Sequence, residues 1–175
     1  MIFLVAAVLL SLERITYILV SRYPEWFRTT CERGLDGALG QPVTALTRLF
    51  YVFKALQLLT FVAWCYVFGY GSSVLVHKSI GAVIIGATLV ILGQALNWGV
   101  FYRLGASGVF YGNRFGHEIS WCREFPFSLF NHPQYVGAVA SIWGFFIAIL
   151  FPYHDWYLLP ALETVYYGIG AWLEV

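Results

Sequence analysis

Five long apolar stretches, separated by polar connections, decide most of what this chain can fold into. They run over approximately residues 1–20, 49–70, 79–102, 134–152 and 156–174. About 20 apolar residues in a helix cross the hydrocarbon core of a bilayer, where only helices and closed barrels satisfy every backbone polar group. The sequence therefore predicts an all-α integral membrane protein, a bundle of four or five transmembrane helices.

The composition agrees with one bundle in lipid. Apolar residues make up 60% of the 175 residues, and charged residues only 11%. Because each span also needs a connection, residues 1–175 have room for a single membrane-embedded domain. The net charge of +1 leaves no polybasic tract, so we expect no nucleic-acid partner. The N-terminal run lacks a preceding basic region and a cleavage pattern, which favours a retained span over a signal peptide.

The three cysteines, Cys31, Cys65 and Cys122, are scattered along the chain. None belongs to a Cys-x-x-Cys pair or to a Cys/His group with the spacing of metal ligands. We therefore expect reduced thiols and no metal site.

Basic residues are distributed unevenly among the connections. Seven arginines lie in or beside the first and third connections, against Lys78 alone at the second. Basic residues collect on the cytoplasmic side of membrane proteins, so both of these connections are predicted to be cytosolic. With five spans, the C-terminal end is then cytosolic too. The seven are Arg22, Arg28, Arg33, Arg48, Arg103, Arg114 and Arg123.

The third connection begins with a run of regularly spaced glycines at positions 105, 108, 112 and 116. Small residues at spacings of three and four let helices pack closely, or let the backbone approach a ligand. Both interpretations stay open on spacing alone. Arg103, Asn131 and His132 are predicted at the same membrane surface, which favours the ligand.

A specific order of elements follows in the C-terminal half. The segment 101–116 reads Phe-Tyr-x-Leu-Gly-x-x-Gly-x-Phe-x-Gly-x-x-Phe-Gly. Phe-Pro-Phe at 125–127 and His-Pro-x-Tyr-x-Gly at 132–137 come next, and then an apolar helix that ends in an acid. In this order, residues 95–175 resemble the phospholipid methyltransferases of the phosphatidylethanolamine N-methyltransferase family. The last two elements are also similar, more loosely, to isoprenylcysteine carboxyl methyltransferases.

The resemblance implies an enzyme that transfers methyl groups from S-adenosylmethionine to the amino headgroup of phosphatidylethanolamine or its mono- and dimethyl derivatives, towards phosphatidylcholine. It also implies a cofactor site at the cytosolic face, among the last helices. Asn113 replaces the family's aspartate, Asn131 an arginine, and Glu174 the usual pair of late glutamates. The cofactor candidates carried over by position are Gly105, Gly108, Gly112, His132, Pro133, Tyr135, Gly137 and Glu174.

The chemistry of the methyl donor gives several side chains a physical role. Arg103 or His132 could bind its carboxylate, and Tyr135 could offer a ring face to its sulfonium. Glu174 could hold the amino group or the ribose hydroxyls. Pro133 starts a predicted helix, where exposed N–H groups favour anions.

Methylation of an amine also needs an acceptor for the amine proton. His132 is the first candidate because neutral imidazole accepts a proton near pH 7, with His117 and Glu118 as further candidates. The alternative is that His132 only caps the helix that follows. Glu163 falls inside the last predicted span and needs a partner there, so we predict a catalytic contact with the substrate amine.

Three charged residues fall inside the earlier spans. Glu13 and Arg14 pair with another helix, contact the lipid headgroup or reach for the cytoplasmic surface, and the sequence leaves these three alternatives open. Lys54 is expected to reach that surface.

Two other functions compete with phospholipid methylation. One is a methyltransferase for another membrane substrate, such as a prenylated carboxylate, and the other is a non-enzymatic membrane scaffold. The substrate lipid is expected to enter laterally between helices, and exposed small residues would permit a homodimer. The membrane would be the endoplasmic reticulum in a eukaryote or the inner membrane in a bacterium.

Overall fold

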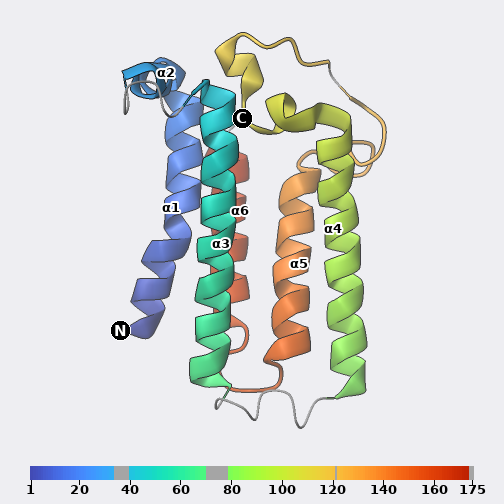
Figure 1. Ribbon diagram of the computed structural model, residues 1–175. Helices are drawn as coiled ribbons and strands as arrows, with labels where there is room; N and C mark the ends of the chain where they lie inside the picture. The colour runs from blue at the N-terminus through green and yellow to red at the C-terminus, as the bar shows by residue number, and fades with distance from the viewer. Residues whose placement is uncertain (34–39, 70–78, 121, 174–175) are drawn as a thin grey trace.

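The computed structural model describes residues 1–33, 40–69, 79–120 and 122–173, which form a bundle of upright helices (Figure 1). Three of these helices, α1, α3 and α4, are each long and apolar enough to cross a membrane, and α5 is a shorter apolar helix. The predicted all-α integral membrane fold is confirmed. The elements are α1 (Ile2–Arg22), α2 (Pro24–Arg33), α3 (Pro42–Phe68), α4 (Ile80–Val109), the 3-10 helix η3 (Gly112–Phe115), α5 (Pro133–Ile149) and α6 (Leu158–Leu173).

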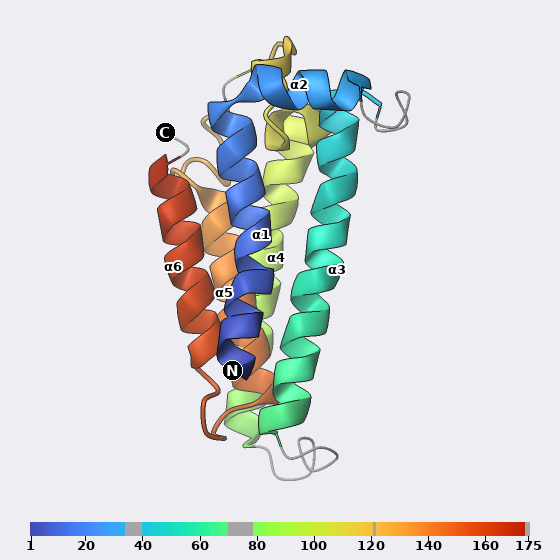
Figure 2. The ribbon, with the colours of Figure 1, turned by 90° about the vertical axis from the view of Figure 1, so that its left-hand side faces the viewer.

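The first connection contains more helix than the apolar pattern predicts. α3 begins at Pro42, seven residues before the expected range, because proline suits a first helical position while Thr47 and Arg48 interrupt the apolar pattern. The short helix α2 lies across the upper end of the bundle (Figure 2). Its Phe27 and Cys31 are buried one turn apart, and its other side is polar.

Two clusters of buried side chains hold the bundle together. The cluster towards the lower end in Figure 1 joins α1, α3, α5 and α6 around Phe61 and Phe146. The other, towards the upper end, joins α1, α2, α3 and the end of α4 around Val20 and Leu46. The three cysteines are free thiols, as expected.

α4 and α5 pack backbone against backbone through two pairs of glycines. A Cβ at Gly93 would lie 2.4 Å from the carbonyl oxygen of Gly137, and a Cβ at Gly144 would lie 2.5 Å from that of Gly86. Such close approach through small residues is typical of membrane helices. Helix packing, one of the roles considered for the glycines of 105–116, is found at these four glycines.

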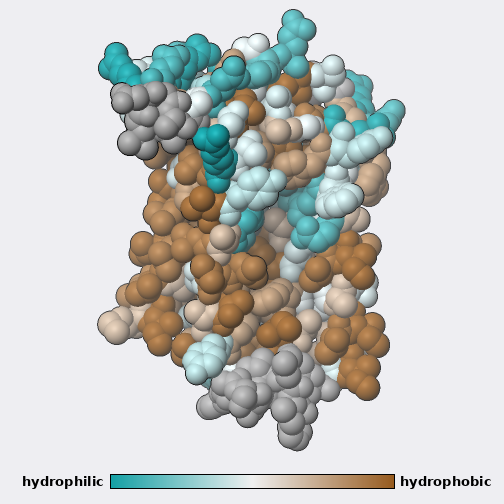
Figure 3. Space-filling view, viewed as in Figure 1, coloured by the Kyte–Doolittle hydropathy of each residue, from teal (hydrophilic) through white to brown (hydrophobic). Residues whose placement is uncertain are grey.

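The ends of the bundle differ in what they carry. α2, the α4–α5 connection (residues 110–132) and the end of α6 lie at the upper end, and the α5–α6 turn lies at the lower end (Figure 1). Hydrophilic side chains gather at the upper end and hydrophobic ones lie below them (Figure 3). The first and third connections therefore share one membrane surface with the C-terminal end of α6. That this surface is cytosolic stays a prediction.

Candidate functional site

A cavity of about 720 Å³ enters the bundle between α3 and α4, with further walls from α1, α5 and α6. Tyr51 of α3 and Trp98 and Tyr102 of α4 line it and are 66%, 80% and 86% exposed. The cavity therefore reaches the outer surface between these two helices. Figure 3 shows hydrophilic side chains inside a hollow bordered by hydrophobic ones.

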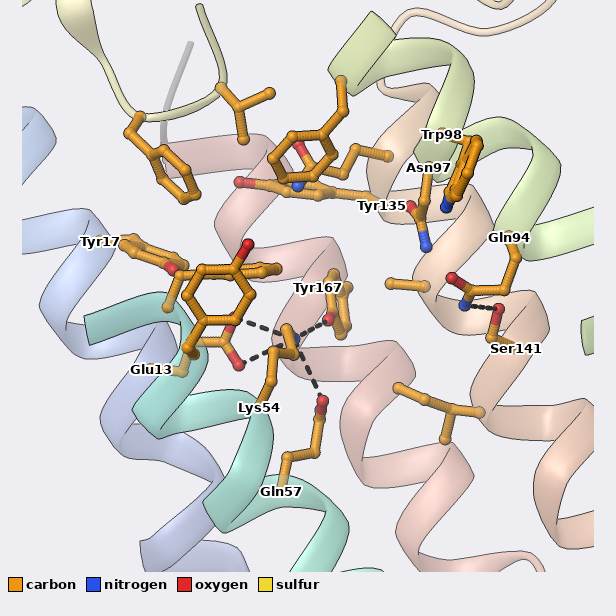
Figure 4. Close-up of a pocket in the computed structure, with 18 of the residues that line it drawn as sticks. Glu13, Tyr17, Lys54, Gln57, Gln94, Asn97, Trp98, Tyr135, Ser141 and Tyr167 are labelled. Atoms are coloured by element: carbon orange, nitrogen blue, oxygen red, sulfur yellow. Dashed lines mark hydrogen bonds and ion pairs between the residues drawn. The ribbon is translucent and has the colours of Figure 1, made fainter. Parts of the chain in front are cut away.

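One wall of the cavity holds an ion-pair network from α1 and α3. The Glu13 carboxylate lies 2.6 Å from Arg14 Nη2 and 3.0 Å from Lys54 Nζ. Lys54 Nζ also donates hydrogen bonds of 3.1 Å to Gln57 and to the Tyr167 hydroxyl (Figure 4). Pairing with another helix, one of the three alternatives for Glu13 and Arg14, is confirmed for Glu13, which binds Lys54 of α3. The expectation that Lys54 reaches the membrane surface is wrong, because Glu13 offers it a carboxylate inside the bundle.

The depth of this network makes the pairing necessary. Arg14 lies eight residues before the end of α1 at Arg22, which is about 12 Å along a helix axis. Glu13 and Arg14 are each only 5% exposed. Isolated charges at such positions are costly, so intramembrane ionisable residues are paired and mark functional sites.

Three tyrosines from three helices surround the Arg14 guanidinium. Its Cζ lies 4.1 Å from the ring centroid of Tyr167, 5.3 Å from that of Tyr17 and 5.5 Å from that of Tyr135. Ring faces attract cations within about 6 Å. Together with the Glu13 carboxylate, the rings create a surrounding that stabilises positive charge.

Polar side chains of α4 and α5 form the opposite wall. Gln94 Nε2 donates a 2.9 Å hydrogen bond to Ser141 Oγ, which in turn donates one of 2.8 Å to the Gly137 carbonyl. Asn97 lines the same wall, three residues after Gln94 (Figure 4). Amide and hydroxyl groups therefore stand across the cavity from the ion-pair network.

Three buried polar atoms of cavity-lining residues have no hydrogen-bond partner within the described part of the chain. They are Arg14 Nη1, Tyr17 Oη and Asn97 Oδ1. A fourth such atom, Nε1 of Trp64, belongs to the lower apolar cluster. Buried polar atoms are nearly always paired, so an unpartnered one indicates a bound ligand or water. The residues that line the cavity thus carry two unpartnered donors on the α1 wall and one unpartnered acceptor on the α4 wall, counted among the described residues.

Among the predicted site residues, Tyr135 lines the cavity. His132 stacks on it, with ring centroids 5.8 Å apart and an interplanar angle of 18°. His132 occupies the N-cap position of α5, but its exposed side chain makes no capping hydrogen bond. Pro133 is the first residue of α5 and is buried. The roles predicted for His132 and Pro133 stay predictions.

The predicted glycines shape the chain at the end of α4. Gly105 has φ 61° and ψ −176°, a conformation that residues with a Cβ avoid. A Cβ at Gly108 would lie 2.5 Å from Leu104 Cβ, and one at Gly112 would lie 2.5 Å from the Ser107 carbonyl oxygen. Because these glycines lack a Cβ, the segment can fold closely onto itself. Residues 109–111 then lie at the cavity wall. Cofactor contact by the glycines stays a prediction.

Two other predicted cofactor residues contact protein groups next to the cavity. Arg103 Nη2 lies 2.5 Å from the Glu124 carboxylate, which ties the end of α4 to the α4–α5 connection. Gly137 packs against Gly93, as described above. Glu174 lies outside the described residues. Their cofactor roles are therefore still predictions.

Glu163 is buried inside the bundle, with 1% of its surface exposed. Gln57 Nε2 donates a 2.6 Å hydrogen bond to it, and Gln57, not Glu163, lines the cavity. The arrangement favours a positioning role through Gln57, and direct contact with a substrate amine stays a prediction.

Sequence reasoning considered a headgroup contact for Glu13 and Arg14 as one alternative but did not predict the α1 and α3 wall as a site. A signal was present, because polar residues recur at helical spacing in two otherwise apolar spans. Glu13, Arg14 and Tyr17 share about one turn of α1, and Lys54 and Gln57 share one turn of α3.

Comparison with known proteins places the C-terminal part of the site in a family. The model of the phospholipid methyltransferase family matches residues 82–172. Phosphatidyl-N-methylethanolamine N-methyltransferase of Arabidopsis thaliana is 34% identical over 119 residues, 67% of this chain and 66% of that protein. Phosphatidylethanolamine N-methyltransferase of Rattus norvegicus is 34% identical over 95 residues, 50% of this chain and 47% of that protein. The chain thus spans less than two thirds of either relative, and no solved structure matches it.

Proposed function

The chain belongs to the phospholipid methyltransferase family, whose members use S-adenosylmethionine, and on this premise we propose its activity. It methylates the amino headgroup of phosphatidylethanolamine or of the mono- and dimethyl derivatives, towards phosphatidylcholine. The observation that carries this proposal is the cavity between α3 and α4, which joins a polar interior to the apolar outer surface. A lipid can place its headgroup there while its acyl chains stay in the bilayer.

The residues of the cavity fit a sulfonium cofactor at the upper end. Tyr111 of the α4–α5 connection and Tyr135 of α5 line that end, and tyrosine ring faces stabilise cations. A volume of about 720 Å³ lies in the range of small-molecule sites. When bound, the cofactor supplies an electrophilic methyl group. Tyr135 would hold it next to the headgroup. Arg103, Gly105, Gly108, Gly112 and Glu174 remain further candidates for binding it.

The amine must lose a proton before or during methylation, and His132 is the proposed acceptor. It stacks on Tyr135 and is exposed, so its imidazole can pass the proton on to solvent. Glu163 would act through Gln57, whose amide it fixes at the cavity wall. Methylation gains most from holding the two reacting groups in line, which several rigid helices around one cavity can do.

The wider setting of the activity is also proposed. Residues 1–175 would act as one methyltransferase domain, because α1 and α3 line the cavity together with the family segment. The site would face the cytosol from the endoplasmic reticulum in a eukaryote, or from the inner membrane in a bacterium. The exposed small residues would also permit the chain to form a homodimer.

Transfer of a labelled methyl group tests the proposal. The purified chain in lipid nanodiscs is given labelled S-adenosylmethionine and phosphatidylethanolamine, its monomethyl or its dimethyl derivative, with phosphatidylcholine as the lipid without an N–H. We expect label in at least one amine lipid and none in phosphatidylcholine. Absence of label in every amine lipid, together with no thermal stabilisation by the cofactor, would contradict it.

A matched pair of histidines tests the proposed proton acceptor. His154 is 88% exposed at the opposite end of the bundle. We expect His132→Ala to lower kcat by roughly 100-fold, within the usual range for acid–base groups, and His154→Ala to leave kcat unchanged. Equal rates for the two variants would remove His132 from the reaction.

A further inference from the structure

We infer that the two polar walls of the cavity form a headgroup site for a zwitterionic phospholipid, in which Arg14 and Tyr17 bind the phosphodiester and Asn97 binds the amine. The inference rests on the proposed function and deepens it, because it names the groups that select the lipid. Arg14 and Tyr17 lie outside the segment 82–172 that defines the family match.

The α1 wall is built to receive an oxyanion. Arg14 gives one side of its guanidinium to Glu13, and its buried Nη1 has no partner within the described residues. The Tyr17 hydroxyl, three residues further on the same helix and equally without a partner there, is a second donor. Two neighbouring donors, one of them cationic, match the oxygens of a phosphodiester.

The charge of the α1 and α3 wall also favours binding of an anion. Glu13 is shared between two cations, Arg14 and Lys54, so the groups that line the wall carry one more positive than negative charge. Lys54 already donates to Glu13, Gln57 and Tyr167, whereas Arg14 keeps a donor with no partner among the described residues. A buried positive group of this kind is stabilised by an anion that enters the cavity.

The α4 wall supplies the complementary group. Asn97 Oδ1 is a buried acceptor that lacks a partner in the described residues, whereas the neighbouring Gln94 amide is engaged by Ser141. An acceptor needs a donor, and an ethanolamine headgroup carries one as long as its nitrogen keeps an N–H. A trimethylated nitrogen has none, so Asn97 distinguishes substrates from phosphatidylcholine and loses its hydrogen bond when the last methyl group is added.

The position of the opening favours a lipid over a water-soluble zwitterion. Trp98 and Tyr102 border the cavity on the outer, apolar side of the bundle, between two helices that span the membrane. A lipid reaches both walls by this route. The amino-acid end of the cofactor has the same pair of charges, so the experiment separates the two ligands.

Removal of the unpartnered atoms provides the test. Tyr17→Phe and Asn97→Leu each delete an atom that has no partner among the described residues of the ligand-free protein, so folding in the absence of lipid should be kept. We expect the KM for phosphatidylethanolamine, as mole fraction in phosphatidylcholine nanodiscs, to rise roughly tenfold in each variant. Tyr157→Phe, at the opposite end of the bundle, is the matched control and should keep the wild-type KM.

Binding without turnover separates this inference from the proposed activity. In detergent, phosphatidylethanolamine should raise the Tm of the wild type more than a diacylglycerol with the same chains, and Tyr17→Phe should abolish the difference. This result in a protein without methyl transfer would support the headgroup site and contradict the activity. Methyl transfer with no such difference in Tm would contradict the headgroup site.

Two further outcomes would overturn the inference. A weaker affinity for S-adenosylhomocysteine in Tyr17→Phe, with an unchanged KM for the lipid, would assign these donors to the cofactor. Wild-type affinities for both ligands in Tyr17→Phe and Asn97→Leu would mean that the buried atoms bind only water.

Discussion

Helix α4 meets its two neighbours in opposite ways. Towards α5, glycines bring the two backbones together at two places, at Gly93 with Gly137 and at Gly86 with Gly144. Towards α3, large side chains and a cavity of about 720 Å³ separate the helices. Membrane helices have no hydrophobic force that closes such a gap, because lipid tails are as apolar as leucine. The tight contact with α5 therefore holds α4 in place while the other face stays open to a substrate.

The two sides also differ in what holds them. Backbone approach stabilises the α4–α5 side through packing, whereas charges stabilise the walls of the open side. Glu13 joins Arg14 to Lys54, and so α1 to α3. Collapse onto apolar side chains would bury the surplus positive charge of Arg14 and Lys54 over Glu13 without an anion to balance it. The charged residues thus help to keep the cavity between α3 and α4 open.

The largest effect is expected from breaking the charged side. Glu13→Gln leaves Arg14 and Lys54 without their shared carboxylate, and we expect it to lower the free energy of unfolding by about 3 kcal/mol. Glu25→Gln is the matched control, because Glu25 pairs with Arg28 at 3.5 Å on the exposed surface of α2. That change should cost about 0.5 kcal/mol or less. Unfolding by denaturing detergent measures both, and equal values would show that the buried network does not stabilise the bundle.

An intermediate effect is expected from breaking the tight side. Gly93→Ala places a Cβ 2.4 Å from the Gly137 carbonyl oxygen, so α4 and α5 must separate, at a cost of about 1 to 3 kcal/mol. In Gly168→Ala of α6, the added Cβ meets no atom of the described residues within 4 Å, so stability should be unchanged or slightly higher. Thermal unfolding in nanodiscs compares the two variants. A wild-type Tm for Gly93→Ala would mean that α4 and α5 are not in contact at this glycine.

The sequence predicts the fold well because the relevant physics is local. The length of an apolar stretch alone decides whether it can span a bilayer, and α1, α3 and α4 follow from it. The place of Tyr135 at the cavity also follows from local sequence, because the motif that includes it spans only six residues.

The contacts between the glycines of α4 and α5 cannot be predicted in this way. The two glycines are seven residues apart in each helix, and they face each other only when the helices are placed antiparallel.

The charged wall is harder to predict for the same reason. Glu13 and Lys54 are 41 residues apart, and each alone resembles a side chain that reaches for the membrane surface. Tertiary packing decides whether they meet. The motifs favour His132 and the glycines at and just after the end of α4, Gly105, Gly108 and Gly112, which lie around the upper end of the site. The deeper polar groups carry no motif.

The smallest effect on stability is expected at Ser141 of α5, which contacts both the cavity wall and the glycine contact with α4. Ser141 Oγ accepts a hydrogen bond from Gln94 on the cavity wall and donates one to Gly137 in the glycine contact. Ser141→Ala removes both, which should lower the free energy of unfolding by about 1 kcal/mol. Ser11→Ala removes an exposed hydrogen bond to Val8 and should change stability by less than about 0.5 kcal/mol.

Coupling between the faces can be measured with the same serine. The double variant Gly93→Ala/Ser141→Ala should lose less stability than the two single changes together, because separating the helices already weakens the hydrogen bond from Gln94 to Ser141. Strict additivity in the unfolding free energies would contradict this. The tight contact and the cavity wall would then be independent, and the packing on α5 would not be what keeps the α3 side of the helix open.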